Sequence, residues 1–346
     1  MLPLLLVACD RPNPAESFAP GPPVPVLEHI LDLRFMDAPE LPTLSAVIAS
    51  RVRGEGFAVA ASANPSVILM FDGEGRFTGP LSRRGMGPGE ISSVRDIVFD
   101  HVDQLWIFGN GRVDIWNQSL NESRTIAIPI AVTSAAAAPQ GGTIVVGTDP
   151  NDIRVRVRHL SDDGALVPLE IEGGAFLRGD PGAEHRSVAP VDESSAWVAM
   201  FHTYEMRRLD RRSGDTIQRI EDDPEWWEVG GDLRDFAGIM DQSPAILSLS
   251  VGPDGTLWTV SGIPTPDAGA VSALYEGDSS AITRLVDHVI RVHDGQSGLL
   301  LCEHHAEYLP LQFLPGDRAA AVYPDGDSIS ISVFSLRPCA GTYSDR

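Results

Sequence analysis

One pattern recurs six times along the chain: a short apolar segment, a tight polar turn and a second apolar segment directly after it. The apolar segments are rich in Val, Ile, Leu and Trp and are bounded by Gly, Asp, Asn or Pro, which is typical of β-strands. Most copies continue into a second hairpin. The repeating unit therefore comprises four strands, and helical periodicity is almost absent. The six turns lie at residues 54–56, 103, 141–142, 192–193, 254–255 and 316–317.

A four-stranded unit repeated about every fifty residues is the pattern of a propeller blade. One blade cannot bury both of its faces, so we predict that six antiparallel blades close into a ring. The last copy has only three strands and ends at residues 329–336, whereas a spare strand occupies residues 26–33. Pairing the two would close the ring and remove two exposed sheet edges. The predicted fold is an all-β, six-bladed β-propeller over residues 26–338, followed by a tail at 339–346.

The first nine residues read MLPLLLVAC, and their end, Leu6-Val7-Ala8-Cys9, resembles the lipobox of bacterial lipoproteins, in which the Cys is acylated. A chance apolar start is the alternative, because the run is short and no positive charge precedes it. We expect residues 1–9 to be a signal peptide and residues 10–25, rich in Pro and Ala, to be a tether. The protein is then exported and anchored to a bacterial membrane only by lipid, in the periplasm or at the cell surface.

Three cysteines occur in the chain. If Cys9 carries lipid, Cys302 and Cys339 remain as a pair near the C-terminus. In an oxidising compartment they could form a disulfide. Two separate thiols are the alternative, because sequence alone does not supply the distance between them.

The charge balance excludes one class of partner. Asp and Glu outnumber the basic residues by 48 to 26, and the formal net charge is −22. Such a surface repels phosphate backbones, so we expect no nucleic acid partner. All the basic residues are Arg, which also excludes a Schiff-base lysine.

A glycine-rich loop, GMGPGEI at residues 85–91, follows the first unit and contains Gly85, Gly87, Pro88, Gly89 and Glu90. It resembles the G-x-G-P-G-E-[FI] signature of exported, NHL-like six-bladed β-propeller proteins of environmental and gut bacteria. The resemblance implies an envelope-associated propeller, often of undefined function and often with a lipoprotein signal. A phosphate-binding loop is disfavoured, since the G-x-G-x-x-G spacing is missing and no helix follows. We interpret the loop as a crossing between blades.

The long connections should all lie on one face of the propeller, and the short hairpin turns on the other. Long loops on a rigid scaffold commonly bind ligands. Trp226 and Trp227 lie in such a loop beside several acids, and Tyr204 should lie on the same face. They could contact a sugar or a peptide, with packing of the loop as the alternative. We therefore expect a protein, peptide or glycan partner at the cell envelope.

Motifs of serine hydrolases, zinc proteases and EF-hands are missing from the sequence. The leading hypothesis is a binding or scaffolding module without catalytic activity and without a predicted cofactor. The alternative is a propeller enzyme, a metal-dependent lactonase or hydrolase or a lyase, with a divalent metal at the central channel. The segment 303–307 (EHHAE) is interpreted as a polar loop between blades instead of a metal site. Candidate metal ligands near the expected face are Asp149, Asp152, His202, Glu205, His288 and Asp325.

Overall fold

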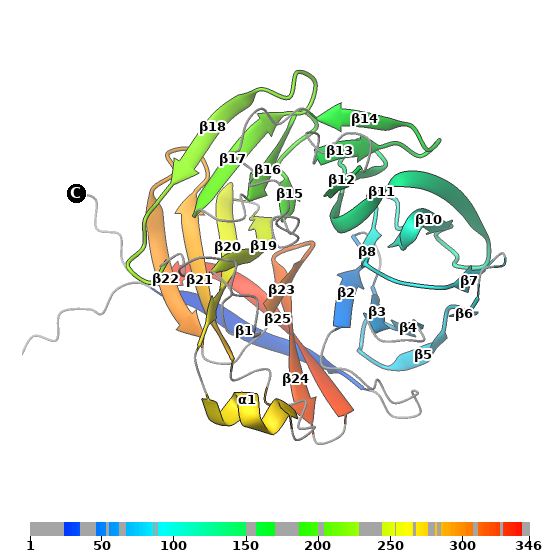
Figure 1. Cartoon of the computed structure of the whole chain (residues 1–346), viewed down its shortest axis with the longest axis horizontal. Helices are drawn as coiled ribbons and strands as arrows, with labels where there is room; N and C mark the ends of the chain where they lie inside the picture. Colours follow the sequence, from blue (N-terminus) through cyan, green and yellow to red (C-terminus); the bar gives the residue numbers. More distant parts are fainter. Residues whose placement is uncertain are drawn as a thin grey trace, which may run out of the picture.

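The computed structural model consists almost entirely of antiparallel β-sheets (Figure 1). Predictions for Cys9, the signal peptide and most of the tether lie outside the described residues. β1 begins at Val24, one residue before the predicted end of the tether, and β25 ends at Ala340, two residues beyond the predicted end of the propeller, because the two strands pair out to these residues. The residues described are 24–34, 46–52, 55–61, 67–85, 87, 89–149, 157–169, 187–199, 204–227, 244–252, 254–265, 268–275, 281, 285–306, 311–325 and 328–340.

Three of the sheets have four antiparallel strands that follow one another in chain order, as the hairpin pattern predicts. The first comprises β2 (Ala46–Ser50), β3 (Phe57–Ala61), β4 (Ile68–Phe71) and β5 (Phe77–Pro80). The second comprises β15 (Val188–Pro190), β16 (Ser195–Ala199), β17 (Glu205–Asp210) and β18 (Thr216–Glu221). The third comprises β19 (Ala245–Val251), β20 (Thr256–Pro264), β21 (Val286–Asp294) and β22 (Leu300–Ala306).

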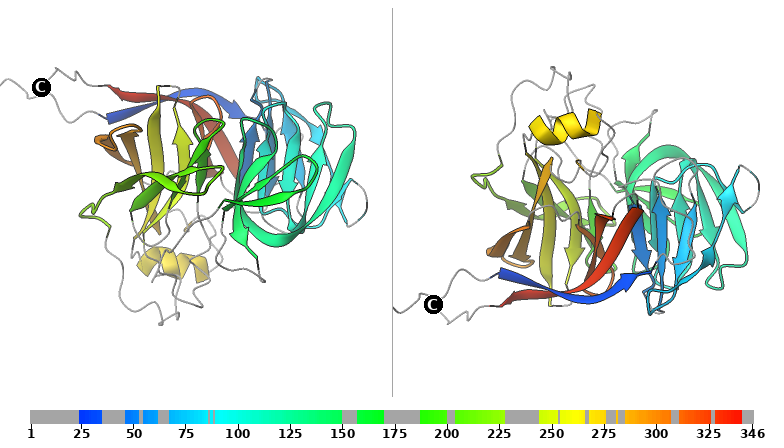
Figure 2. Two further views of the ribbon diagram at one scale, coloured as in Figure 1. Left: turned by 90° about the horizontal axis from the view of Figure 1, so that it is seen from above. Right: turned by 90° about the horizontal axis from the view of Figure 1, so that it is seen from below.

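The fourth four-stranded sheet joins the two ends of the described chain. Its order is β1-β25-β24-β23, and β1 pairs antiparallel with β25 from Val24–Ala340 to Leu33–Ile331. The two strands lie side by side in every view (Figures 1 and 2). The outer edge of the C-terminal hairpin is thus covered by an N-terminal strand. The strands are β23 (Leu311–Leu314), β24 (Arg318–Asp325), β25 (Ser328–Ala340) and β1 (Val24–Leu33).

A seven-stranded sheet contains two of the predicted units, joined by one long strand, β11. β11 pairs with β10 in its first part and with β12 in its second, whereas the sequence pattern indicated a separate strand at residues 135–138. Pro129 lies between the two parts, where a missing N–H breaks no ladder bond. The strands are β8 (Asp96–Phe99), β9 (Leu105–Phe108), β10 (Asn110–Trp116), β11 (Ser123–Ala137), β12 (Thr143–Thr148), β13 (Val157–Leu160) and β14 (Leu166–Leu169).

The sheets are arranged around a common centre, with β2, β8, β15, β19 and β23 as the strands nearest to it (Figure 1). β2 contacts β8 and β23, β11 contacts β8 and β15, and β19 contacts β15 and β23. Side chains also bond to neighbouring backbones: the Gln312 amide donates to the Ile48 carbonyl at 2.9 Å and accepts from its N–H at 3.0 Å. Ser187 Oγ donates to the Leu247 carbonyl at 2.8 Å. These bonds tie together inner strands that are far apart in sequence.

The apolar cores lie between neighbouring sheets. Between the first and the last sheet, Phe57 and Leu69 pack with Leu314 and Val333, and all four are buried. Strands such as β9, β12 and β16 are buried along almost their whole length because both of their faces are covered by neighbouring sheets. This explains their nearly continuous apolar runs, whereas the edge strand β18 is mostly exposed.

Short Asp-containing turns form the hairpins from local hydrogen bonds. In the β17–β18 turn, Asp210 Oδ1 accepts from the Ser213 N–H at 2.8 Å, and Gly214 follows with φ of 79°. Asp294 and Gly298 repeat the arrangement in the β21–β22 turn, where Gly298 has φ of 77°. Aspartate caps the turn and glycine adopts the left-handed conformation at no steric cost. These turns are therefore specified by five consecutive residues each.

The glycine-rich loop crosses between sheets. Its ends form a short parallel ladder of β6 (Arg83–Arg84) with β7 (Glu90–Ile91). The Gly87 N–H donates to Glu90 Oε2 at 2.9 Å. A Cβ at Gly85 would lie 1.9 Å from the same oxygen, so only glycine leaves room for the carboxylate. The loop is closed by its own glutamate; Pro88 lies outside the described residues.

The β20–β21 connection contains the helix α1 (Ala268–Tyr275), which the sequence pattern did not indicate. Figure 2 shows α1 standing clear of the sheets. Ala270 packs with Ala281 and Leu285 in a small cluster of their own. A helix of this length depends on such tertiary contacts and leaves little periodicity in the sequence. Among the described residues no helix is long and apolar enough to cross a membrane.

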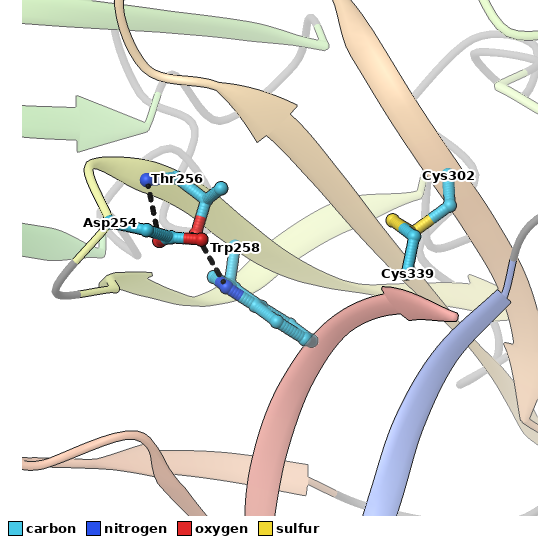
Figure 3. The surroundings of a disulfide bond; sticks show 5 residues. All are labelled: Asp254, Thr256, Trp258, Cys302 and Cys339. Carbon is cyan, nitrogen blue, oxygen red and sulfur yellow. Dashed lines mark hydrogen bonds between the residues drawn. A yellow bond between two sulfur atoms is a disulfide. The ribbon is translucent and has the colours of Figure 1, made fainter. Parts of the chain in front are cut away.

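Cys302 of β22 and Cys339 of β25 are disulfide-bonded in the structure (Figure 3). The bond joins the outermost strand of the third four-stranded sheet to the sheet that contains both chain ends. Figure 3 also shows the β19–β20 turn, where Thr256 Oγ1 donates to Asp254 Oδ1 at 2.6 Å and accepts from Trp258 Nε1 at 3.0 Å. The turn therefore also anchors the indole of a buried tryptophan.

Candidate functional site

Polar side chains are concentrated between the β15–β18 sheet and the β19–β22 sheet. Part of this interface is apolar, with Trp197, Met206 and Leu257 buried. The rest of the interface is lined by polar side chains, and two of them, Thr259 and Arg291, are buried as well. Buried charge is costly unless it is paired, so such an interface is a candidate for function. We call it the Arg291 cluster, comprising Tyr204, Asp222, Trp226, Thr259, Arg291, His293 and Glu303.

Strand register places the central residues of the cluster in one row. Thr259 of β20 pairs with Arg291 of β21, which pairs with Glu303 of β22. Directly paired residues project from the same face of a sheet, here the face toward β17. The segment 303–306 is thus part of strand β22 and not the inter-blade loop that the sequence suggested. Alternating polar residues in β20 and β21 are the sequence signal that would have indicated this row.

Arg291 is held by two carboxylates and two aromatic rings. One nitrogen lies 2.7 Å from Asp222 Oδ2 and another lies 2.9 Å from Glu303 Oε2, while the arginine side chain is only 4% exposed. Its guanidinium carbon lies 4.6 Å from the centre of the Tyr204 ring and 5.7 Å from that of Trp226. Stacking on aromatic faces and pairing with carboxylates together stabilise the buried cation.

A chain of hydrogen bonds runs behind Arg291. The Tyr204 hydroxyl lies 2.8 Å from Thr259 Oγ1 and 3.1 Å from His293 Nε2. His293 Nδ1 faces the Gly298 carbonyl at 3.3 Å, which can only accept a hydrogen bond. The proton is therefore assigned to Nδ1 of a neutral imidazole, Nε2 accepts from Tyr204, and Tyr204 accepts from Thr259. With this assignment, the hydroxyl of Thr259 donates to Tyr204 and the hydroxyl of Tyr204 donates to His293.

The two titratable groups in this series of hydrogen bonds, His293 and Tyr204, are both neutral near pH 7. Burial, together with the nearby Arg291 charge, lowers the pKa of His293 to about 4. Burial raises the pKa of Tyr204 to about 12, even though Arg291 favours the phenolate. Arg291 therefore carries the positive charge at the centre of the cluster, opposite the carboxylates of Asp222 and Glu303.

The three aromatic residues predicted for the ligand face come together here. Tyr204 and Trp227 are buried at 2% and 7% exposure, with ring centres 5.3 Å apart, so the packing alternative describes these two. Trp226 is only partly buried and donates from Nε1 to Glu303 Oε2 at 3.2 Å. His305 is exposed and lies 3.1 Å from Glu303 Oε1. Of the three aromatics, Trp226 thus offers accessible surface.

Hydrogen bonding at this interface is incomplete. Within the described part of the chain, Arg291 Nη1, Ser261 Oγ and Trp227 Nε1 are buried and have no hydrogen-bond partner. Buried polar atoms without partners are rare in native proteins and commonly mark ordered water or a functional site. These groups add to the reasons for regarding the interface as more than structural packing.

The predicted metal ligands are paired or dispersed. Asp149 Oδ2 lies 3.6 Å from an Arg158 nitrogen. Glu205 pairs with Arg207 and with Arg219; burial raises its pKa, but hydrogen bonds from these two arginines more than offset this and the pKa is lowered. In the described ranges no three His, Cys, Asp or Glu side chains are arranged to hold a metal ion.

Of the remaining candidate metal ligands, only the side chain of His288 lies among the described residues. His288 is buried, and burial lowers its pKa to about 4. Its backbone pairs with Gly262 in β20 and with Ala306 in β22. Asp152, His202 and the side chain of Asp325 lie outside the described residues.

Asp96, at the start of the inner strand β8, was not indicated by the sequence. Its Oδ2 accepts from the Ala135 N–H of β11 at 2.6 Å, and Oδ1 accepts from the Ile97 N–H at 2.8 Å. Burial nevertheless raises the pKa of Asp96 to about 7. The carboxyl thus joins two inner strands, and its charge changes close to neutral pH.

We expect Asp96→Asn to change the pH dependence of stability. Because its pKa is raised in the folded state, the native protein binds a proton that the unfolded chain releases near pH 4. The contribution of Asp96 to the free energy of unfolding is therefore full below pH 4 and is lost as the pH rises to about 7, by up to ~1.4 kcal/mol per pH unit. Urea unfolding across this window should show a difference between wild type and variant that falls with pH. Parallel curves would contradict a raised Asp96 pKa.

Comparisons with known proteins support the fold. No protein-family model and no curated protein matches the sequence. A member of the DUF4221 family from Bacteroides vulgatus aligns at 10% identity over 91% of this chain and 99% of its own, with a TM-score of 0.62. A protein from Bacteroides fragilis that is described as exported aligns at 12% identity over 91% and 95%, with a TM-score of 0.58.

The chain has a propeller-type fold. A calcium-binding protein, regucalcin from Agrobacterium tumefaciens, also aligns over 90% of this chain and 95% of its own, with 8% identity and a TM-score of 0.51. Identities this low reflect shared architecture, and one propeller architecture serves many functions. Function must therefore be argued from the residues of the site.

Proposed function

We propose that the protein is a six-bladed β-propeller whose ring is closed by β1. The seven-stranded sheet counts as two blades that share β11, and the cyclic contacts of the six inner strands support this count. The pairing of β1 with β25 supports closure by the N-terminal strand. We further propose export and lipid anchoring through Cys9, which the lipobox-like sequence supports. The proposed propeller domain comprises the predicted residues 26–338, extended to Val24 and Ala340 because β1 and β25 include them, and it follows the signal peptide and the tether.

The proposed function is binding of a basic peptide segment of an envelope partner at the Arg291 cluster. The observation that carries this proposal is Trp226, a partly exposed indole fixed by Tyr204, Trp227, Arg291 and Glu303. Rigid aromatic side chains with supporting contacts are typical anchors of binding interfaces.

The charge around Trp226 supports a basic partner. Asp223 and Glu225 are exposed on the same segment, and Asp222 and Glu303 are partly exposed at its base. Arginine and lysine side chains bind well where aromatic faces and carboxylates are combined. The net charge of −22 would also attract a basic partner from a distance.

Binding accounts for the ionisable groups better than catalysis does. Arg291 is paired with Asp222 and Glu303, and Glu205 is paired with two arginines, so these charges are already matched within the protein. A general acid or base needs a pKa near the working pH and access to a substrate proton. We therefore propose a binding or scaffolding role in preference to an enzymatic one.

The test is titration of the full-length, detergent-purified protein with a fluorescent oligoarginine peptide, with an oligoglutamate peptide and an N-acetylglucosamine oligomer as comparison probes. We expect saturable binding of oligoarginine alone, weakened about tenfold by Trp226→Ala, because an anchor residue is removed. Asp223→Asn combined with Glu225→Gln should weaken binding about fivefold through lost charge attraction.

A matched control separates specific binding from general attraction to an acidic protein. Asp162→Asn with Asp163→Asn removes the same charge from the exposed β13–β14 turn and should change affinity less than about twofold. Equal effects of the two double variants would overturn the proposal. Binding of the sugar oligomer in place of the peptide would assign the site to glycans instead.

A further inference from the structure

A pocket of about 310 Å³ lies on the hairpin edge of the sheets, apart from the Arg291 cluster. It lies where the β2–β3 and β4–β5 turns meet the β10–β11 turn of the next sheet. This volume is at the lower end of the range of small-molecule sites, ~300–1,000 Å³. Its lining includes Arg51, Glu55, Met70, Thr78, Leu81 and Leu120.

Leu120 lines this pocket in a strained backbone conformation. Its φ is 55°, in the left-handed region that bulky residues rarely occupy. Its N–H donates back to the first residue of the turn, as a positive-φ glycine does in six other hairpin turns and Asp103 does in the β8–β9 turn. Those glycines are Gly75, Gly141, Gly164, Gly214, Gly255 and Gly298.

A bulky residue keeps a positive φ only where the surrounding structure maintains it, and such backbone strain is found more often at functional sites. The turn around Leu120 is closed by the side chains of Asn117 and Asn121, which are hydrogen-bonded at 2.8 Å. The leucine side chain is partly buried and packs on the core below it. At this position Leu120 supplies the pocket with an apolar surface that a glycine would lack.

Arg51 and Glu55 bring opposite charges to the same pocket without pairing. The Arg51 guanidinium carbon lies 5.3 Å from the centre of the Phe99 ring, and Nη1 reaches the Gln118 carbonyl at 3.4 Å. Glu55 packs over Gly73, where a Cβ would lie 2.7 Å from the Glu55 carboxylate. Across the described ranges, neither Arg51 nor Glu55 has an oppositely charged side chain within ion-pair distance.

Neighbouring sheets fix the backbone that carries Arg51. Arg318 of β24 donates to the Arg51 carbonyl at 3.2 Å. Asp103, in the β8–β9 turn, accepts from the Val52 N–H at 2.8 Å through Oδ1. Both contacts come from outside the β2–β5 sheet, so the position of Arg51 is set by three sheets. Such support is what a preorganised binding residue requires.

We propose that this pocket binds an apolar α-amino acid or a dipeptide with free termini. The ligand carboxylate pairs with Arg51, its ammonium group pairs with Glu55, and its side chain packs on Met70, Leu81 and Leu120. Two unpaired opposite charges held apart in one pocket complement a zwitterion better than a singly charged ligand.

Isothermal titration calorimetry of the full-length protein tests this with four probes. Leucine and leucyl-leucine carry both charges, N-acetyl-leucine lacks the ammonium group, and leucinamide lacks the carboxylate. We expect saturable binding of a zwitterion, with the tighter of leucine and leucyl-leucine identifying its length. Loss of either charge, or Arg51→Met or Glu55→Gln, should weaken binding about tenfold or more, because a charge-assisted bond is lost.

Two further variants keep the result interpretable. Glu74→Gln removes an exposed carboxylate of the adjacent turn, which pairs with Arg76, and should leave affinity within about twofold. Leu120→Gly should weaken binding while the melting temperature stays the same or rises, because backbone strain is relieved. Absence of saturable binding, equal binding of the singly charged probes, or a lower melting temperature with unchanged affinity for Leu120→Gly would overturn the proposal.

Discussion

Replacing Arg291 with Met is expected to lower the free energy of unfolding by about 3 kcal/mol. Removing one partner of a buried ion pair strands the other, and ~3–5 kcal/mol is typical. We expect the lower end, because Asp222 and Glu303 are 39% and 28% exposed and regain some water. The cation–π contacts with Tyr204 and Trp226 are lost as well. Urea denaturation followed by tryptophan fluorescence measures the change.

Arg219→Met is the matched control for this experiment. Arg219 also contacts two carboxylates, those of Glu205 and Glu221, but its side chain is 48% exposed. Exposed ion pairs contribute ~0–1 kcal/mol, so the control should lose less than about 1 kcal/mol. Arg291→Lys should fall between the two variants, since it keeps the charge but not the planar fork. Equal losses for Arg291→Met and Arg219→Met would contradict a tightly coupled cluster.

Removing the disulfide is the second change with a large expected effect. Replacing Cys302 and Cys339 with Ala should lower the free energy of unfolding by about 2–4 kcal/mol. The bond spans 37 residues and restricts the unfolded chain, and it also ties β22 to the sheet that contains both chain ends. Alanine avoids burying a new hydroxyl at position 302, which is 5% exposed. Thermal and urea unfolding of the two proteins measure the loss.

A reductant is the internal control for the cysteine pair. Reducing conditions should destabilise the wild-type protein by a similar amount and leave the double variant unchanged. Thiol titration of the denatured wild-type chain should reveal two additional thiols after reduction. A wild-type protein whose stability and thiol count do not respond to reductant would show that the bond is absent in solution.

The strands were largely predictable because their signals are local. The predicted segments 96–99, 105–108, 188–190 and 311–314 coincide with β8, β9, β15 and β23. Their ends are set by turn residues a few positions away, whose hydrogen bonds and φ angles do not depend on the rest of the molecule. The long β11 differed, since its first part pairs with β10 and its second part with β12, and the two parts form one strand only when both partners are in place.

The candidate site was predictable only in part. Tyr204, Trp226 and Trp227 were expected on one face, and they do come together. Arg291, which they surround, was missed because it lies in an ordinary strand 87 residues beyond Tyr204. Of the residues that contact it, Tyr204 directly precedes β17, Asp222 and Trp226 follow β18, and Glu303 lies in β22. No spacing rule links such positions.

By itself, the sequence determined the hairpins, the four-stranded repeat and the need of the last unit for one more strand. These follow from apolar runs and from turns such as Asp210–Gly214, whose bonds form within five residues. Tertiary structure alone decided that Cys302 meets Cys339, that Arg291 pairs with Asp222 and Glu303, and that Leu120 lines one pocket together with Arg51 and Glu55. The reason is physical: Coulomb and contact energies depend on distances between segments, and those distances exist only once the sheets have packed.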